Sequence, residues 1–574
     1  MKKNDIIRLE ITDVTGEGNG VGRHDGMAIF VPFTAAGDVI DCRVVKVMKN
    51  YAYGIIQSIV KAAKFRCDPA CDVFKKCGGC AFRHFEYAEE LAAKQRFVEA
   101  SFARIGKLSV PFEEILGCDR LDGYRNKAQY PVGTDENGRL VCGFYSRRSH
   151  RVVDYTDCAL QPPVFGEIVR AVLSWCNEHR VRAYDELTGK GLLRHIYLRC
   201  GEYSGEIMLC LVVTRLNGCD FSPLAKQITE QFPDVKSIVL NLNDKNTNVI
   251  LGQTCKTIFG TDFITDTMCK KTFRISPLSF YQVNTRQAER LYGIAREYAD
   301  LKPGETLLDL YCGVGTIGLS VVGEDNRLIG VEIIPSAIEN AKQNAALNRI
   351  ENAEFFCGDA GEIAEKLLRR GEAPDVVIAD PARKGCDALS IESILKMAPK
   401  RIVMISCNHA TAARDCAELT KGGYRIVKGR AVDLFPRTTH VECVALLSRK
   451  INAHKMNLNS SPFEMIKSGE KTIELRLYDE KRQQVKVGDK IVFTNNTTGE
   501  TLHSTVVKLH RFDNFDELYK TLPLLKCGYT TDNIDTATPA DMEQYYSVEE
   551  QKKYGVVGIE LFRPKEITDE TVVL

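Results

Sequence analysis

The chain has 574 residues, which at about 150 residues per domain corresponds to roughly four domains. Hydrophobic residues make up 44% and charged residues 27%, which excludes a mainly disordered or fibrous chain. Lys and Arg (77) balance Asp and Glu (76), so any binding to nucleic acid must depend on local patches of charge.

The chain carries 21 cysteines. Its N-terminus, MKKNDIIRLE, is charged and has no apolar signal segment, which argues against export and against disulfide bonds. No stretch reaches the roughly 18 apolar residues of a membrane span. We therefore expect a cytoplasmic protein with reduced thiols, some of which act as metal ligands or nucleophiles.

The sequence pattern indicates a multidomain α/β chain. Short alternating runs between glycine turns predict a small antiparallel β-barrel over residues 1–62. Residues 63–268 begin with a cysteine-rich loop and continue as a mixed α+β domain. Residues 269–450 alternate strands and helices, which predicts a parallel, doubly wound sheet. After a linker, residues 456–574 read as a second small β-barrel.

A glycine loop follows the first strand of the doubly wound segment. It reads Asp309-Leu-Tyr-Cys-Gly-Val-Gly-Thr-Ile-Gly318, and its glycines allow a tight turn against a ligand. Alone, it fits a structural turn or a dinucleotide site equally well. Glu332 ends the next strand, where an acidic side chain suits a ribose diol, and Asp380 ends a later one. Together these features resemble class I S-adenosylmethionine-dependent methyltransferases, which implies a Rossmann-like domain.

Two further strand ends carry groups suited to attack on a base. Cys407 lies at a strand-to-helix turn, where amide groups stabilise a thiolate; the alternative is a small buried hydrophobe. Carbon 5 of uracil accepts a methyl group only after a thiolate adds at carbon 6, and a base must then remove the carbon 5 proton. Glu442, at the start of the last strand, is the candidate base. The segment from Asp380 to Arg383 lacks the Asn-Pro-Pro-Tyr type motif expected for methylation of an adenine amine.

Four motifs carry a more specific resemblance: SCNHATAARD, DPARKG, LFPRTTHVE and SFYQVN. Over about residues 1–450 the chain resembles the RNA (uracil-5-)-methyltransferase family, particularly its bacterial 23S ribosomal RNA branch. The resemblance implies Cys407 as nucleophile and Glu442 as base. It implies four contacts to S-adenosylmethionine: Gln282, Tyr311, Glu332 and Asp380. The family usually has proline at the positions of Ala382 and His409, so the shape of these two loops is expected to differ from that of the family.

The cysteine-rich loop places three thiols close together, and Cys158 supplies a fourth. Four thiolates suit either zinc or an iron-sulfur cluster. The family resemblance implies a 4Fe-4S cluster with a structural role, held by Cys71, Cys77, Cys80 and Cys158. Cys67 is then a spare thiol or the ligand in place of Cys71.

RNA contacts are predicted in several places. The N-terminal barrel resembles a TRAM domain. Residues 123–127 and 144–151 interleave aromatic and basic side chains, which predicts either an RNA-contacting patch or solvated strand faces. Phe280 is either a stacking partner for a flipped base or a core residue. The G-x-K-x-x-E-x-R motif at 469–476 resembles ASCH domains, PUA-like barrels that hold RNA or, in some relatives, hydrolyse a modified nucleoside.

We therefore expect a monomeric enzyme that methylates carbon 5 of a uridine in a loop or single strand of 23S ribosomal RNA, with no DNA or membrane partner. Transfer RNA is the alternative substrate. The TRAM-like barrel and the cysteine loop favour ribosomal RNA, because simpler bacterial transfer-RNA enzymes of the family lack both. A non-catalytic RNA-binding or assembly factor is the alternative from a different class.

Overall fold

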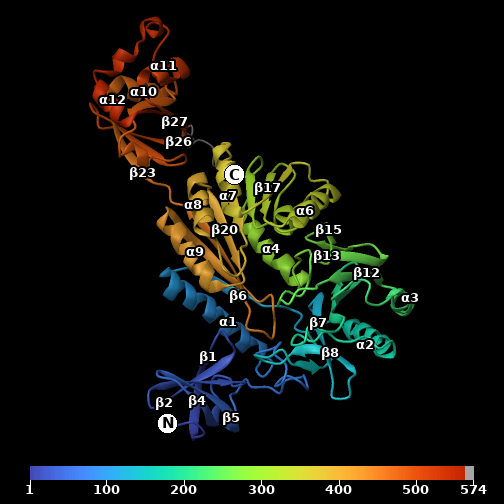
Figure 1. Ribbon diagram of the computed structural model, residues 1–574. Coiled ribbons are helices and arrows are strands. Elements are labelled where there is room, and N and C mark those ends of the chain that lie inside the picture. Colours follow the sequence, from blue (N-terminus) through green and yellow to red (C-terminus); the bar gives the residue numbers. More distant parts are fainter. Residues whose placement is uncertain (563–574) are drawn as a thin grey trace, which may run out of the picture. The chain divides into compact units, whose positions relative to one another are not determined.

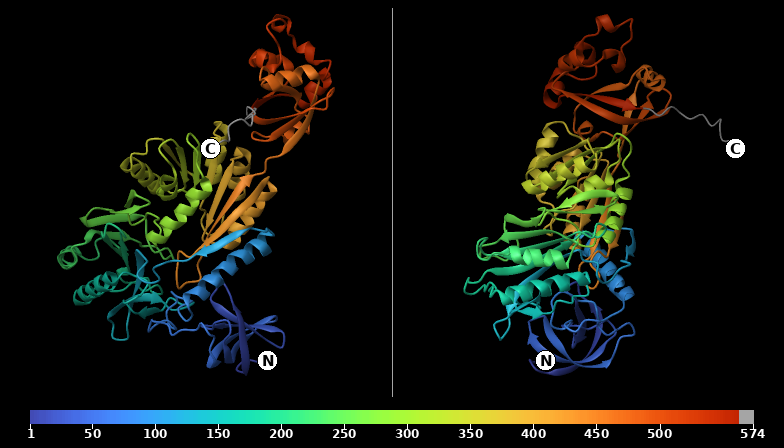
Figure 2. Two further views of the ribbon diagram at one scale, coloured as in Figure 1. Left: turned by 180° about the vertical axis from the view of Figure 1, so that it is seen from behind. Right: turned by 90° about the vertical axis from the view of Figure 1, so that its right-hand side faces the viewer.

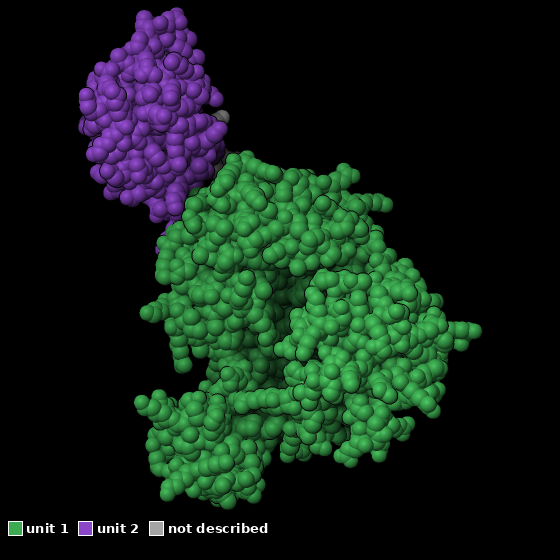
Figure 3. All heavy atoms as spheres, in the orientation of Figure 1, with its two compact units in different colours: residues 1–449 green, residues 450–574 purple. Residues whose placement is uncertain are grey.

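The computed structural model describes residues 1–562, and the chain divides into two compact units at residues 449 and 450 (Figure 3). Among these described residues, no helix is long and apolar enough to cross a membrane. The end of the predicted segment 456–574, from residue 563 onward, lies outside them.

The first unit begins with a closed barrel (Figure 1). Around it run, in the order β1-β2-β3-β5-β4, the strands β1 (Ile6–Val14), β2 (Asn19–His24), β3 (Met27–Pro32), β5 (Tyr51–Lys61) and β4 (Val39–Val47). The predicted barrel is confirmed, but β3 and β5 are parallel, with Ala28 opposite Tyr51, so a wholly antiparallel barrel was the wrong expectation. The reason is that β5 forms a hairpin with β4 along one edge and closes the barrel against β3 along the other.

A mixed sheet with helices on one face follows the cysteine-rich loop. Its order is β13 (Thr254–Gly260), β12 (Val235–Leu242), β11 (Ile207–Val213), β10 (Leu193–Cys200), β7 (Lys127–Thr134), β8 (Leu140–Tyr145) and β9 (Val152–Asp154). Helices α2 (Pro163–Glu178) and α3 (Ser222–Gln231) bury Phe165, Val172 and Leu224 against it. A hairpin of β14 (Ile264–Met268) and β15 (Lys271–Ile275) comes next.

The largest sheet of the first unit is the predicted Rossmann-like one. Its order is β18 (Ala353–Cys357), β17 (Arg327–Glu332), β16 (Thr306–Leu310), β19 (Val376–Ala379), β20 (Arg401–Ser406), β22 (Glu442–Arg449), β21 (Tyr424–Val432) and β6 (Phe112–Leu116). The strands from β18 to β20 are parallel, as expected, whereas β22 runs antiparallel to both its neighbours.

Helices cover both faces of this sheet (Figures 1 and 2). They are α4 (Thr285–Ala299), α5 (Thr316–Val321), α6 (Pro335–Leu347), α7 (Ala360–Arg369), α8 (Ala388–Met397) and α9 (His409–Lys421). Alternation along each strand divides the core: Leu308 and Val377 face α7, α8 and α9, whereas Leu307 and Ile378 face α4 and α5. Because both faces are buried, the strands are almost uniformly apolar.

Two elements of the predicted central domain belong to this sheet instead. β6 pairs with β21, with Phe112 opposite Gly429, and α1 (Tyr87–Ser101), continued by the π-helical turn η1 (Phe102–Gly106), packs on α9. The expected boundary after residue 268 also falls inside the β14–β15 hairpin. The segment 63–268 therefore does not form a separate structural piece.

The second unit contains one five-stranded sheet in the order β23 (Ala453–Leu458), β25 (Lys490–Asn495), β26 (Thr501–Phe512), β27 (Val556–Phe562) and β24 (Ile473–Leu477). Its helices are α10 (Ser460–Ser468), α11 (Phe515–Thr521) and α12 (Val548–Tyr554), with short 3-10 turns η2 (Arg482–Gln484), η3 (Leu524–Cys527), η4 (Ile534–Thr536) and η5 (Pro539–Met542). In residues 450–562 this sheet is open, so a closed PUA-like barrel is not found there.

Candidate active site

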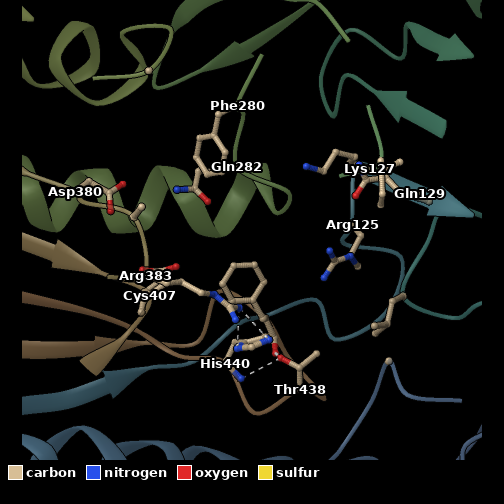
Figure 4. A pocket seen from close by; sticks show the side chains of 18 of the residues that line it. Arg125, Lys127, Gln129, Phe280, Gln282, Asp380, Arg383, Cys407, Thr438 and His440 are labelled. Carbon is tan, nitrogen blue, oxygen red and sulfur yellow. Dashed lines mark hydrogen bonds between the residues drawn. The ribbon is translucent and has the colours of Figure 1, made fainter. Parts of the chain in front are cut away.

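A cavity of about 930 Å³ in the first unit is lined by all the predicted site residues except the alternative ligand Cys67. These residues are Cys407, Glu442, Gln282, Tyr311, Glu332, Asp380, Cys71, Cys77, Cys80 and Cys158. Figure 4 labels Cys407, Gln282 and Asp380 among them. They come from the carboxyl ends of β16, β17, β19 and β20, from the start of β22, and from loops of the central region. Chain segments more than 300 residues apart thus meet at one site, although the individual roles stay predictions.

The glycine loop is fixed by hydrogen bonds to two acidic side chains. Asp309 Oδ2 accepts from the Gly318 amide at 2.8 Å, and Glu332 Oε2 accepts from the Gly313 amide at 3.1 Å. Gly313 and Gly315 have φ angles of 56° and 84°, a left-handed conformation that glycine adopts without strain. Glu332 is therefore held against the loop at the strand end, where a carboxylate suits a ribose diol.

Two aspartates lie near that loop, Asp309 fully buried and Asp380 partly exposed. Burial raises the pKa of Asp309 to about 8 and that of Asp380 to about 7. Asp380 follows β19 and faces the cavity, whereas Asp309 is enclosed and serves the loop. Across from them the hydroxyl groups of Tyr311 and Ser390 lie 3.2 Å apart, which holds the Tyr311 ring on the cavity wall.

Cys407 lies between β20 and α9, as expected, but the helix end does not lower its pKa. The Asn408 side chain caps α9 by accepting from the Ala410 amide. Burial, followed by the charges of the nearby Glu442 and Asp380 carboxyl groups, raises the pKa of the Cys407 thiol to about 11. The neutral thiol therefore predominates at pH 7, and the expected amide-stabilised thiolate is not found.

Arg383 is the cation of this cluster. Glu442 and Asp380 raise the pKa of Cys407, whereas the Arg383 guanidinium lowers it through its charge and a side-chain hydrogen bond. Its Nη2 also lies 3.3 and 3.4 Å from the two ring nitrogens of His440 (Figure 4). The sequence placed Arg383 in a motif without a role and left His440 unassigned, because no local pattern indicates that they meet Cys407.

Glu442 begins β22 opposite Val432 and is only 4% exposed. Burial raises the pKa of its carboxyl well above the usual value, and Asp380 raises it further. A carboxyl with a raised pKa binds a proton strongly, which is the property needed of a base that must accept one from carbon.

The opposite wall of the cavity is basic and aromatic. Arg125, Lys127 and Gln129 face the side that carries Phe280 and Gln282 (Figure 4). Phe280 is 60% exposed, so its alternative assignment as a core residue is wrong. Burial lowers the pKa of Lys127 to about 7.

The predicted RNA-contacting patch of the central region is only partly free. The Tyr124 ring is buried, and Phe144 packs on Tyr130 with ring centroids 5.0 Å apart. Arg147 lies over the Phe33 ring at 4.3 Å and donates to the Cys80 carbonyl at 2.7 Å. Part of the basic and aromatic pattern therefore joins the barrel to the cysteine-rich loop.

The four predicted cluster cysteines surround the other end of the cavity, and all 21 cysteines are free. Besides burial, the charges of Cys77 and Cys71 raise the pKa of Cys80, so the thiols are near one another. Within residues 1–562, however, no three His, Cys, Asp or Glu side chains are grouped so as to hold a metal ion. The described arrangement therefore gives the predicted 4Fe-4S cluster no support of its own, and the cluster stays a prediction.

Comparison with known proteins agrees with this site. The tRNA (Uracil-5-)-methyltransferase family profile matches residues 224–450, the TRAM domain profile residues 2–56 and the ASCH domain profile residues 456–565. An RNA methyltransferase of Oceanobacillus iheyensis is 41% identical over 454 residues, covering 79% of this chain and 98% of that protein. One of Clostridium tetani is 40% identical over 448 residues, covering 78% and 97%.

A solved structure is similar over most of the chain. It is Pyrococcus abyssi tRNA (uracil-54, C5)-methyltransferase in complex with S-adenosyl-L-homocysteine, with a TM-score of 0.62 and 27% identity, covering 77% of this chain and 100% of that one. Fold and site therefore define an S-adenosylmethionine-dependent RNA methyltransferase. The chain belongs to the RNA (uracil-5-)-methyltransferase family and carries an N-terminal TRAM domain and a C-terminal ASCH domain.

Proposed function

We propose that the enzyme methylates carbon 5 of a uridine in 23S ribosomal RNA. The observation that carries the proposal is the meeting of Cys407, Arg383 and Glu442 at the cavity that also holds the glycine loop. A thiol for carbon 6, a cation beside it and a carboxyl for the carbon 5 proton are the groups that methylation of a uracil carbon requires.

Gln282, Tyr311, Glu332 and Asp380 would hold S-adenosylmethionine, whose sulfonium supplies the methyl group. Glu332 suits the ribose hydroxyls because its carboxylate is already oriented by the Gly313 amide. Asp380 places negative charge beside a cationic ligand. Tyr311 offers a ring on the same wall.

The chain's own groups account for the remaining chemistry. Cys407 gives its proton to solvent and its sulfur adds to carbon 6 of uracil, which makes carbon 5 an enolate carbon. That carbon would take the sulfonium methyl group and leave S-adenosylhomocysteine. Arg383 favours the thiolate. Glu442 then takes the proton from carbon 5, the carbon 6–sulfur bond breaks, and the Cys407 thiolate is restored.

RNA would enter over the basic and aromatic wall. A uridine must leave its stack to reach Cys407, and the exposed Phe280 ring offers a stacking surface for it. Arg125 and Lys127 line the cavity across from Phe280 and suit phosphates or base edges (Figure 4). The TRAM and ASCH domains would add further contacts. Hydrolysis of a modified nucleoside is the alternative role of the ASCH domain.

We further propose that Cys71, Cys77, Cys80 and Cys158 hold a 4Fe-4S cluster with a structural role. Support comes from the four thiols, which all line one cavity and are free of disulfide bonds. Cys67 does not line the cavity, and its thiol donates to the Arg83 carbonyl at 3.6 Å, which favours Cys71 as the ligand. Free thiols throughout suit the reducing cytoplasm.

Transfer RNA is the second candidate substrate, because the similar solved structure is a transfer-RNA enzyme. We propose that the enzyme acts as a monomer. In the test, the purified protein is incubated with 23S ribosomal RNA and, separately, with transfer RNA, both from a strain that lacks the gene. Mass spectrometry of the nucleosides should find new 5-methyluridine in the ribosomal RNA. New 5-methyluridine in transfer RNA alone would reassign the substrate, and none in either would favour a non-catalytic RNA-binding or assembly factor.

A further inference from the structure

The connection from β21 to β22 leads directly to the base Glu442, and its backbone is bound by four separate parts of the chain. Successive carbonyls of residues 434–437 each accept a hydrogen bond. The donors are Asn284 Nδ2 to Leu434 O at 3.1 Å, Lys94 Nζ to Phe435 O at 3.1 Å, the Tyr124 hydroxyl to Pro436 O at 3.0 Å, and the Ala81 and Phe82 amides to Arg437 O at 2.9 and 3.2 Å.

Such bonding is unusual for a loop. Most surface connections leave their carbonyls to water and move more than the strands they join. Here the donors come from the start of α4, from α1, from the segment before β7 and from the loop just after Cys80. These donors are far from the turn in the chain; Lys94, for example, bonds to Asp433, which lies 339 residues further along.

Lys94 is the centre of this arrangement and is fully buried. Its ammonium donates to Glu90 Oε1 and to Asp433 Oδ1, both at 2.7 Å, besides the Phe435 carbonyl. Glu90 Oε1 accepts in addition from the Arg437 amide at 2.7 Å. A buried ion cluster of this kind contributes little net stability compared with apolar side chains, but it specifies one geometry.

The turn that Lys94 holds leads into one wall of the cavity. The turn continues into Thr438, His440 and Glu442, which all line the cavity, whereas Lys94 and Tyr124 do not. Thr438 Oγ1 bonds back to the Phe435 carbonyl at 2.8 Å, so the position of residue 435 is transmitted to the wall. Lys94 and Tyr124 therefore act on the site only through the turn.

We propose that residues 433–438 form a brace that holds Glu442 in position to take the carbon 5 proton, and that Lys94 and Tyr124 are positioning residues for this step. The inference rests on the proposed uridine methylation and adds the residues that orient its base. Cys407 follows β20 and Asp380 follows β19, and none of the donors to the carbonyls of residues 434–437 comes from these two strands. We therefore expect the addition of Cys407 and methyl transfer to tolerate the loss of one hydrogen bond to the brace.

The test separates the two halves of the reaction. Lys94→Met removes the ammonium that the buried Glu90 and Asp433 carboxyl groups share and risks misfolding. Tyr124→Phe is therefore the decisive variant, because it removes only one hydroxyl. Its matched control is Tyr424→Phe, since Tyr424 is equally buried and its hydroxyl donates to the Pro399 carbonyl at 2.7 Å, away from the cavity. Turnover is measured on uridine RNA, and the rate of covalent complex formation on 5-fluorouridine RNA, whose fluorine replaces the proton that Glu442 removes.

Tyr124→Phe should lower turnover on uridine RNA about tenfold and accumulate the Cys407–RNA complex, because a small displacement of a catalytic group is costly. Its complex formation on 5-fluorouridine RNA should match that of Tyr424→Phe. Equal turnover of the two variants, or an equal fall of Tyr124→Phe in both assays, would overturn the brace. If the wild-type protein gives neither 5-methyluridine nor complex, the proposed function itself fails, and the brace with it.

Discussion

Asp380 lies close enough to Glu442 for its charge to raise the pKa of the Glu442 carboxyl, which burial has already raised. Burial also raises the pKa of Asp380 to about 7. Two carboxyl groups that lie this close titrate together, and a proton bound to Glu442 must leave before this carboxyl can act as a base.

The first prediction concerns the pH dependence of kcat/KM. Cys407, with a pKa raised to about 11, and Glu442, with a raised pKa, both act in the deprotonated form. Protonation therefore inactivates both groups, and kcat/KM should rise with pH between about 6 and 9. A profile of initial rates that falls over this range would contradict the assigned roles.

The positive charge of bound S-adenosylmethionine should lower the pKa of the Asp380 and Glu442 carboxyl groups. S-adenosylmethionine carries a sulfonium and S-adenosylhomocysteine does not, so the methylated form should favour ionised Asp380 and Glu442. Its Kd should fall more steeply from pH 6 to pH 8 than that of S-adenosylhomocysteine, as measured by calorimetry. Asp380→Asn should reduce the difference, and identical pH slopes for the two ligands in the wild type would disprove the placement of the sulfonium.

Loss of the base should trap the enzyme on its substrate. Glu442→Gln cannot take the carbon 5 proton, so a Cys407–RNA complex should accumulate on ordinary uridine RNA while turnover falls about a thousandfold. Glu305→Gln is the control, because Glu305 is also buried but lies outside the cavity. Denaturing electrophoresis detects the complex; turnover close to that of the control would mean that another group is the base.

The cysteine cluster makes a prediction about iron. Protein purified without oxygen should contain about four iron atoms per chain and show charge-transfer absorbance. Cys71→Ser should lose most of the iron and lower the midpoint of thermal unfolding, whereas Cys67→Ser should keep both. Iron retained in Cys71→Ser but lost in Cys67→Ser would reverse the ligand assignment, and absence of iron from the wild type would refute the cluster.

Local patterns predicted the Rossmann-like strands, the glycine loop and the positions of Cys407 and Glu442 at strand ends. These features repeat within short windows, and carboxyl ends of parallel strands necessarily meet at one edge. The pairing of β6 with β21 escaped prediction because it joins residues that are far apart in the chain and leaves no local signal. The roles of Arg383 and Lys94 were missed for the same reason, and the raised pKa of Cys407 depends on burial that only the folded chain reveals.

The central claim is that Cys407 attacks a uracil in RNA, and its most direct test is a covalent one. The protein is incubated with S-adenosylmethionine and 5-fluorouridine-containing ribosomal RNA, digested, and examined by mass spectrometry for a modified peptide. We predict a nucleotide carrying an added methyl group attached to Cys407, and none in Cys407→Ala. A wild-type protein that forms no adduct, or an adduct at another cysteine, would contradict the mechanism.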